Sequence, residues 1–94
     1  MEKSIHTPEY AALRIELKAA REKAGLSQRD LAQSLDVPHS WVAKVETGER
    51  RIDFVEFCWF LSACGVAPED VSERLIRRIQ RSRKENSGRG RHSK

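Results

Sequence analysis

The most regularly spaced charged side chains in this sequence are arginines near its carboxyl end. They recur every three or four residues, at Arg74, Arg77, Arg78 and Arg81. On a helix this spacing places all four on one face. A row of guanidinium groups can bind phosphates along a nucleic acid, and the affinity for the nucleic acid would then fall steeply as the salt concentration rises. It can equally serve only to keep the chain in solution, and both interpretations stay open here.

Residues that could catalyse a reaction or bind a metal form no recognisable pattern. The three histidines, His6, His39 and His92, are scattered along the chain. The sequence has no metal-ligand spacing, no glycine-rich phosphate loop and no nucleophile accompanied by a base. Cys58 and Cys64 are separated by about 600° of helical rotation, so they cannot bridge each other. We therefore expect no enzymatic activity, no metal, no cofactor and two reduced thiols.

The formal net charge of +4 is distributed unevenly along the 94 residues. Residues 1–73 contain nine basic and thirteen acidic side chains, a net charge of −4, whereas residues 74–94 contain nine basic side chains and one acid, a net charge of +8. This length favours a single domain. No apolar run approaches the roughly 18 to 20 residues that span a bilayer, and the polar start shows no secretory signal. We expect a cytoplasmic protein without membrane contact.

Helix signals recur along the chain. Thr7 and Pro8 are typical of a helix start, and Ser27 with Asp30 predicts a capping box, as does Asp53 with Glu56. The expected helices span residues 8–24, 27–35, 38–46, 54–64 and 68–83. No alternating pattern indicates a strand. The sequence therefore predicts an all-α, compact five-helix domain over residues 8–83, followed by a disordered basic tail over residues 84–94.

The second and third expected helices are short and separated by a tight turn. Asp36, in that turn, tolerates a left-handed backbone conformation. Two helices joined in this way form a helix-turn-helix, whose second helix has the right size to enter a major groove of DNA. Short helix pairs also occur in other folds, so this arrangement alone does not decide the family.

Three motifs carry a closer likeness. They are LSQRDLA at residues 26–32, VETGERR at residues 45–51, and Leu61-x-x-Cys64-Gly65-Val66. In this spacing the chain resembles the Xre/Cro-type, lambda-repressor-like helix-turn-helix domains of bacteria and phages, from about Tyr10 to Leu75. The resemblance implies a five-helix domain that binds double-stranded DNA, usually as a dimer on a two-fold symmetric site.

The resemblance also implies roles for individual residues. The residues implied to contact base edges are His39, Ser40 and Lys44, all on the third helix. The residues implied to contact phosphates are Gln28, Trp41, Arg50 and Arg51. The alternatives are a solvated helix face for the polar residues and packing for the tryptophan. Arg21 and Glu46 resemble a structural pair that fixes the angle of the third helix.

Two positions depart from the family pattern. Pro38 stands where Ser or Thr usually caps the third helix, and Asp36 stands where Gly is common. Neither change removes a DNA contact. Acidic residues around the motif would weaken phosphate affinity, which favours binding by a dimer.

The fourth expected helix is apolar on more than one side. Its core positions are expected to be Phe54, Phe57, Cys58, Leu61 and Cys64. The remaining apolar residues, with two on the fifth helix, predict a homodimer surface made of Val55, Trp59, Phe60, Ile76 and Ile79. The alternative is that the fifth helix covers the fourth within one chain.

Together these features predict a sequence-specific transcriptional regulator that reads a palindromic operator in the nucleoid as a dimer. A repressor or autoregulator is the favoured form. The alternative function is an antitoxin or an adaptor that uses the same helical domain to bind a toxin or another protein. Co-purification with such a partner would favour that alternative.

Overall fold

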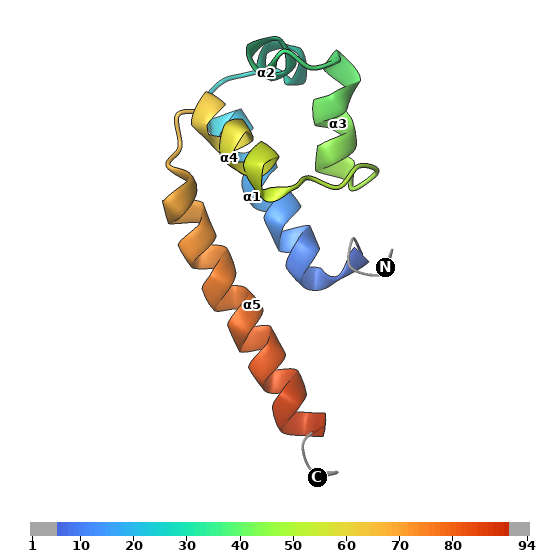
Figure 1. Cartoon of the computed structure of the whole chain (residues 1–94), viewed down its shortest axis with the longest axis vertical. Coiled ribbons are helices and arrows are strands. Elements are labelled where there is room, and N and C mark those ends of the chain that lie inside the picture. Colours follow the sequence, from blue (N-terminus) through green and yellow to red (C-terminus); the bar gives the residue numbers. More distant parts are fainter. Residues whose placement is uncertain (1–5, 91–94) are drawn as a thin grey trace.

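A computed structural model describes residues 6–90, with side chains through residue 84. The helices are α1 (Pro8–Lys23), α2 (Gln28–Leu35), α3 (His39–Thr47), α4 (Phe54–Ala63) and α5 (Pro68–Gly90). Residues 6–90 contain no strand, so the predicted all-α, five-helix architecture is confirmed. Figure 1 shows α1 to α4 gathered at one end of the molecule, with α5 running alongside α1 and past it.

Local capping explains where the helices begin. The Thr7 hydroxyl accepts a hydrogen bond from the Tyr10 N–H at 3.1 Å, at the start of α1. Ser27 and Asp30 exchange bonds of 2.9 and 3.1 Å in the predicted capping box of α2. A second capping box begins α4 at Asp53. These contacts lie within one helical turn, which is why the sequence alone could place the helix starts.

The turn between α2 and α3 uses a left-handed residue, as predicted. Asp36 has φ 59° and ψ 46°, and its N–H donates to the Gln33 carbonyl at 3.2 Å. Pro38 then occupies the N-cap position of α3 without a side-chain capping bond. Because its ring fixes φ near the helical value, proline can begin this helix even without a hydroxyl cap.

The core draws on all five helices. Its fully buried side chains are Leu17, Leu31, Val42, Val45, Phe60, Leu61 and Val71. Helices α2 and α3 pack against each other; α2 also packs against α4, and α3 packs against α1. The recognition helix of the predicted motif is therefore anchored through its inner face, at Val42 and Val45, while its outer face stays free of the core.

Two phenylalanines of α4 were assigned to the wrong environment by the sequence: one predicted at the surface is buried, and one predicted in the core is exposed. Phe60, predicted at a dimer surface, is 0% exposed and belongs to the core. Phe54, predicted in the core, is 72% exposed and stacks on Phe57 with ring centroids 6.4 Å apart. The reason is positional: Phe54 is the first residue of α4, at the edge of the domain, whereas Phe60 lies on the inner face with Phe57 and Leu61. Helix periodicity could not separate them because α4 is apolar nearly all round.

Helix α5 is longer than predicted. It continues past residue 83 to Gly90, although Asn86, Ser87 and the two glycines of residues 84–90 have low helix propensity. Val71 and Leu75 are its buried anchors, and further along Ser82 donates a 2.7 Å hydrogen bond to Glu9 of α1. The predicted disordered tail thus overlaps the helix at residues 84–90, and residues 91–94 lie outside the described residues. None of the described helices combines the length and apolarity needed to cross a membrane.

Candidate nucleic-acid interface

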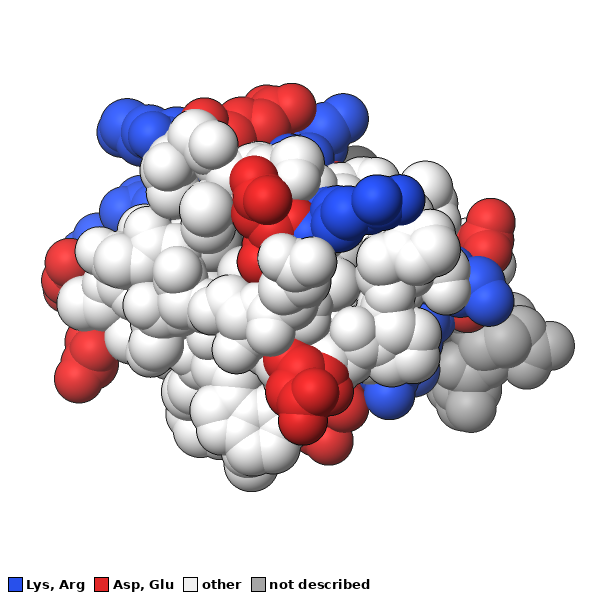
Figure 2. Space-filling view, turned by 90° about the horizontal axis from the view of Figure 1, so that it is seen from above, with Lys and Arg blue, Asp and Glu red and all other residues white. Residues whose placement is uncertain are grey.

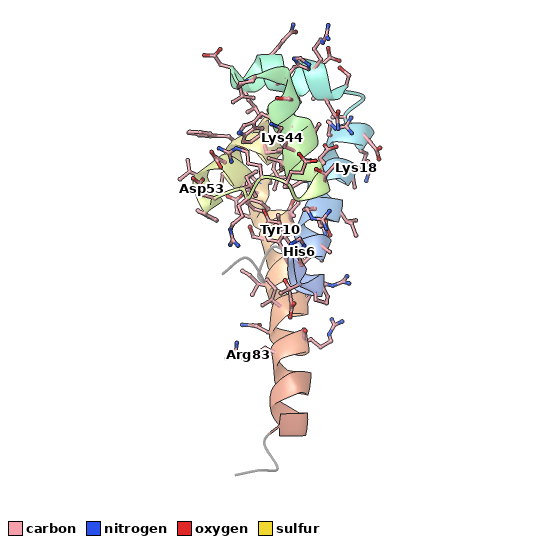
Figure 3. All side chains as sticks on the ribbon, turned by 90° about the vertical axis from the view of Figure 1, so that its right-hand side faces the viewer. His6, Tyr10, Lys18, Lys44, Asp53 and Arg83 are labelled. Atoms are coloured by element: carbon pink, nitrogen blue, oxygen red, sulfur yellow. The ribbon has the colours of Figure 1, made fainter. Side chains whose placement is uncertain are left out.

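The outer face of α3 carries the three residues implied to contact bases. His39, Ser40 and Lys44 are all exposed, opposite the buried Val42 and Val45. Ser40 and Lys44 are one turn apart and therefore share a direction, with His39 beside them at the helix start. Figure 3 shows α3 toward the viewer with Lys44 labelled on it. The arrangement offers a hydroxyl, an imidazole and an ammonium group on one accessible helix face.

A buried ion pair fixes the far end of α3 to α1. Arg21 Nε donates to Glu46 Oε2 at 2.7 Å, and Arg21 Nη2 donates to Glu46 Oε1 at 3.1 Å. The two side chains are only 10% and 3% exposed. Arg21 Nη1 also donates to the Leu26 carbonyl at 2.8 Å, and the hydrogen bonds that Arg21 donates to the Glu46 carboxylate raise the pKa of Arg21. The structure thus pairs the residues that the resemblance pairs, and the pair sets the position of α3.

A second arginine, which the sequence analysis missed, braces the same helix end. Arg14 Nη1 donates to the main-chain carbonyl of Glu46 at 3.1 Å. Its Nε is buried and has no hydrogen-bond partner within the described residues. Gly48, with φ 87°, lets the Arg14 chain pass close by, since a Cβ there would lie 3.1 Å from Nε. Arg14 and Arg21 are seven residues apart, so the two-turn spacing on α1 was the available signal.

Gln28 makes a hydrogen bond within the domain and is also one of the residues expected to contact a phosphate. It is the first residue of α2, where free backbone N–H groups can hold an anion. Its Nε2 donates to Glu46 Oε1 at 3.0 Å. A side-chain amide carries two N–H donors, so this bond leaves one for a phosphate. Gln28 thereby links the N-terminal end of α2 directly to the ion pair between α1 and α3.

Arg50 and Arg51 both contact aromatic rings. The Arg50 guanidinium lies 5.1 Å from the centroid of Trp41 and forks onto Glu56 with bonds of 3.3 and 3.2 Å. The Arg51 guanidinium lies 5.4 Å from the Tyr10 ring centroid. Trp41 itself is partly buried against the core. The loop after α3 is therefore held in place by its own cations, and Glu56 offsets part of the charge that Arg50 would offer to a phosphate.

The comparisons with known proteins match this geometry. The family model described as "Helix-turn-helix domain" matches residues 12–75, which is more than half of the chain. A solved structure, an XRE-family like protein from Pseudomonas syringae pv. tomato str. DC3000, is 40% identical with a TM-score of 0.73. The alignment covers 79% of this chain and 90% of that one. The chain belongs to the Xre-type helix-turn-helix family.

The matched region of this Xre-type domain runs from α1 into α5 and includes both helices of the motif. The chain is accordingly a DNA-binding transcription regulator. A comparison with the curated proteins gave no significant match.

The surface charge of the Xre-type domain is mixed. Figure 2 looks onto the end of the molecule that carries α2 and α3, and it shows acidic and basic side chains interspersed around a largely uncharged area. Exposed acids close to the motif include Asp30, Asp36 and Glu49. Within the described residues, no group of three or more His, Cys, Asp or Glu side chains could hold a metal ion. A single motif of this charge has little general electrostatic attraction for DNA.

Proposed function

We propose that this protein is a repressor that reads a palindromic operator as a homodimer. The observation that carries the proposal is the exposed row of His39, Ser40 and Lys44 on a helix whose opposite face is buried and whose far end is fixed by Glu46. Base reading requires donors and acceptors held at a fixed angle, and this helix offers both. A dimer seated on an operator within a promoter would block transcription there, in the nucleoid.

Helix α3 suits a major groove in size. Its nine residues give a length of about 14 Å, and a single helix fits the roughly 12 Å width of the groove. In this docking Lys44 donates to the O6 and N7 acceptors of a guanine. Ser40 and His39 lie nearer the helix start and contact neighbouring base edges.

The proposed phosphate contacts gather near the C-terminal end of α3. Gln28, at the N-terminus of α2, bonds Glu46 there, and the loop with Arg50 and Arg51 follows the same end. The Trp41 ring lies 5.1 Å from the Arg50 guanidinium and is partly exposed, so it can lie along the sugar-phosphate backbone. These contacts set the docking angle and carry no sequence information of their own.

The apolar residues left exposed on α4 and α5 support a dimer. They are Phe54, Val55, Trp59, Ile76 and Ile79. Phe54, Ile76 and Ile79 line a groove of about 420 Å³ that Tyr10 and Ile52 complete. Several large apolar side chains exposed close together indicate a surface that a partner covers. A second copy fits because a two-fold axis would bring the same exposed apolar residues of α4 and α5 against this groove.

Selection of bound duplexes from a random pool at physiological salt tests the operator. We expect a palindrome whose half-sites are about 10 bp apart, centre to centre. The Lys44→Ala variant should lose its preference at one position of each half-site, because one base contact contributes roughly 1 to 3 kcal/mol of discrimination. Lys18→Ala, on the exposed side of α1, is the matched control and should select the wild-type sequence. Enrichment of no sequence by the wild type would contradict base reading by α3.

Analytical ultracentrifugation tests the dimer. The wild type should sediment as a dimer at micromolar concentration without DNA. Trp59→Ser combined with Ile79→Ser should raise the dissociation constant at least a hundredfold, because burying each such side chain contributes about 1.5 to 3 kcal/mol. Ile15→Ser is the control, since Ile15 is 66% exposed on α1, away from the proposed surface. A wild-type monomer at micromolar concentration would rule out the stable dimer.

A further inference from the structure

Helix α5 presents three distinct faces beyond its start. Val71 and Leu75 are buried against the domain, and Ile76 and Ile79 line the apolar groove. The third face carries four arginines, Arg74, Arg77, Arg78 and Arg81. The apolar and basic faces point in different directions, so a partner on one leaves the other accessible.

The basic face is not a flat stripe but one wall of a furrow between α1 and α5. All four arginines line a groove of about 320 Å³ together with Ile15 and Glu16 of α1. Arg78 and Arg81 also line a second groove of about 370 Å³, with Glu9 and Ser82. Because the two grooves share these arginines, the furrow continues along α5. Figure 1 shows the corresponding length over which α5 lies beside α1.

The positive charge of this furrow is only partly neutralised. Arg74 bonds Glu16 at 2.8 Å, and Arg77 lies 3.5 Å from the exposed Glu73. Arg78 and Arg81 have no hydrogen bond or ion pair to any described side chain. The arm that carries them has a net charge of +8 over residues 74–94, against −4 for the rest of the chain. This surface therefore attracts a polyanion, whereas the body of the domain does not.

The chemistry of the furrow favours phosphates of a nucleic-acid duplex. Its cations are arginines, whose forked guanidinium groups bind phosphate oxygens in a bidentate manner. Residues three or four apart on a helix rise by about 4.5 to 6 Å, a spacing at which successive side chains can follow a phosphate backbone. In the described part of the chain no aromatic ring lines either groove, so the furrow offers no surface on which unpaired bases could stack.

We propose that the arginine face of α5 is a second DNA-binding surface, which binds duplex phosphates outside the groove read by α3. The inference rests on the proposed DNA-binding function and adds an element that contributes affinity without reading sequence. It also gives a physical reason why a chain whose residues 1–73 have a net charge of −4 can bind DNA: the attraction that these residues do not provide comes from the arginines of α5.

The dependence of binding on salt tests this surface. Fluorescence anisotropy would measure the dissociation constant between 50 and 200 mM salt for a duplex of the selected sequence and for a scrambled duplex. The test variant is Arg78→Gln with Arg81→Gln, which leaves the Arg74–Glu16 pair intact. The matched control is Lys18→Gln with Lys23→Gln, which removes the same charge from the exposed side of α1. Circular dichroism would verify that α5 stays helical.

We expect the slope of log K against log salt to fall in magnitude by about 3.6 in the arginine variant, because the homodimer loses four phosphate contacts and each neutralised phosphate contributes about 0.9. The wild type should then lose roughly 150-fold more affinity than this variant between 50 and 200 mM salt. The change should be the same on both duplexes. The lysine control should keep the wild-type slope.

Two results would overturn the inference. One is a slope of log K against log salt that is the same in the arginine variant as in the wild type. This face would then contact an acidic protein or only solvent, and not DNA. The other is an equal change in both variants, which would reduce the effect to net charge. If neither duplex is preferred but only the arginine variant changes the slope, this inference stands and sequence-specific reading by α3 fails.

Discussion

The Glu46→Ala variant is expected to lose about 3 to 5 kcal/mol of unfolding free energy. The carboxylate accepts two hydrogen bonds from Arg21 and one from Gln28, and it is almost fully buried. Its removal leaves a guanidinium group in the interior with no anionic partner. Because a small domain has only about 5 to 15 kcal/mol of stability in total, the urea midpoint should fall by a large fraction.

Glu49→Ala is the control, because Glu49 is an exposed carboxylate three residues away. It should leave the urea midpoint nearly unchanged. The Glu46→Ala variant should also bind the operator more weakly than the wild type, at a temperature where the variant is still folded. The reason is that α3 has lost its attachment to α1. A variant that unfolds like the wild type yet binds poorly would show that Glu46 contacts DNA and does not brace the helix.

A double variant separates the ion pair from the space it fills. Arg21→Met with Glu46→Leu removes both charges together and replaces them with side chains of comparable volume. We expect it to recover most of the stability lost by Glu46→Ala, because no buried charge is left alone. If this stable variant still binds the operator weakly, the ion pair is needed to hold α3 at the correct angle.

The helices and their starts could be predicted because the signals are local. Thr7, Ser27 and Asp53 cap their helices through contacts within a single turn, so no knowledge of the fold is needed. The left-handed Asp36 is local in the same sense. The Arg21–Glu46 pair is not local, and only the family resemblance pointed to it. Arg14 bonds a main-chain carbonyl 32 residues away, and a backbone oxygen leaves no trace in the sequence.

The sequence predicted less well which side chains are covered by a neighbouring helix. In α5 the arginine spacing correctly placed four cations on one face, but the sequence could not show that α1 forms the other wall of the furrow. Nor could the sequence show that Glu56 and Trp41 contact Arg50, the side chain that the family resemblance implies for a phosphate. In both instances the deciding neighbour comes from another helix, and pairing between helices is set by packing and not by periodicity.

The exchange between Phe54 and Phe60 has a direct experimental consequence. Phe60→Ala should lose about 3 to 5 kcal/mol of stability, since the ring is 0% exposed and its removal leaves a cavity in the core. Its neighbour Trp59 is 59% exposed, so Trp59→Ala serves as the matched aromatic control. In the monomer that control should change the stability by no more than about 0.5 kcal/mol.

Protein concentration distinguishes the core from the interface in this comparison. A side chain at a dimer surface stabilises the fold by mass action, so its effect on the urea midpoint grows with protein concentration. The loss in Phe60→Ala should therefore be nearly the same at dilute and at high concentration. The loss in Trp59→Ala should be small when dilute and increase as the wild type dimerises. A loss of stability in Phe60→Ala that depends on protein concentration would place Phe60 at the dimer interface. The expected pattern instead gives the two adjacent aromatic residues of α4 separate roles. Phe60 packs the helices of one chain together, and Trp59 packs the two copies together.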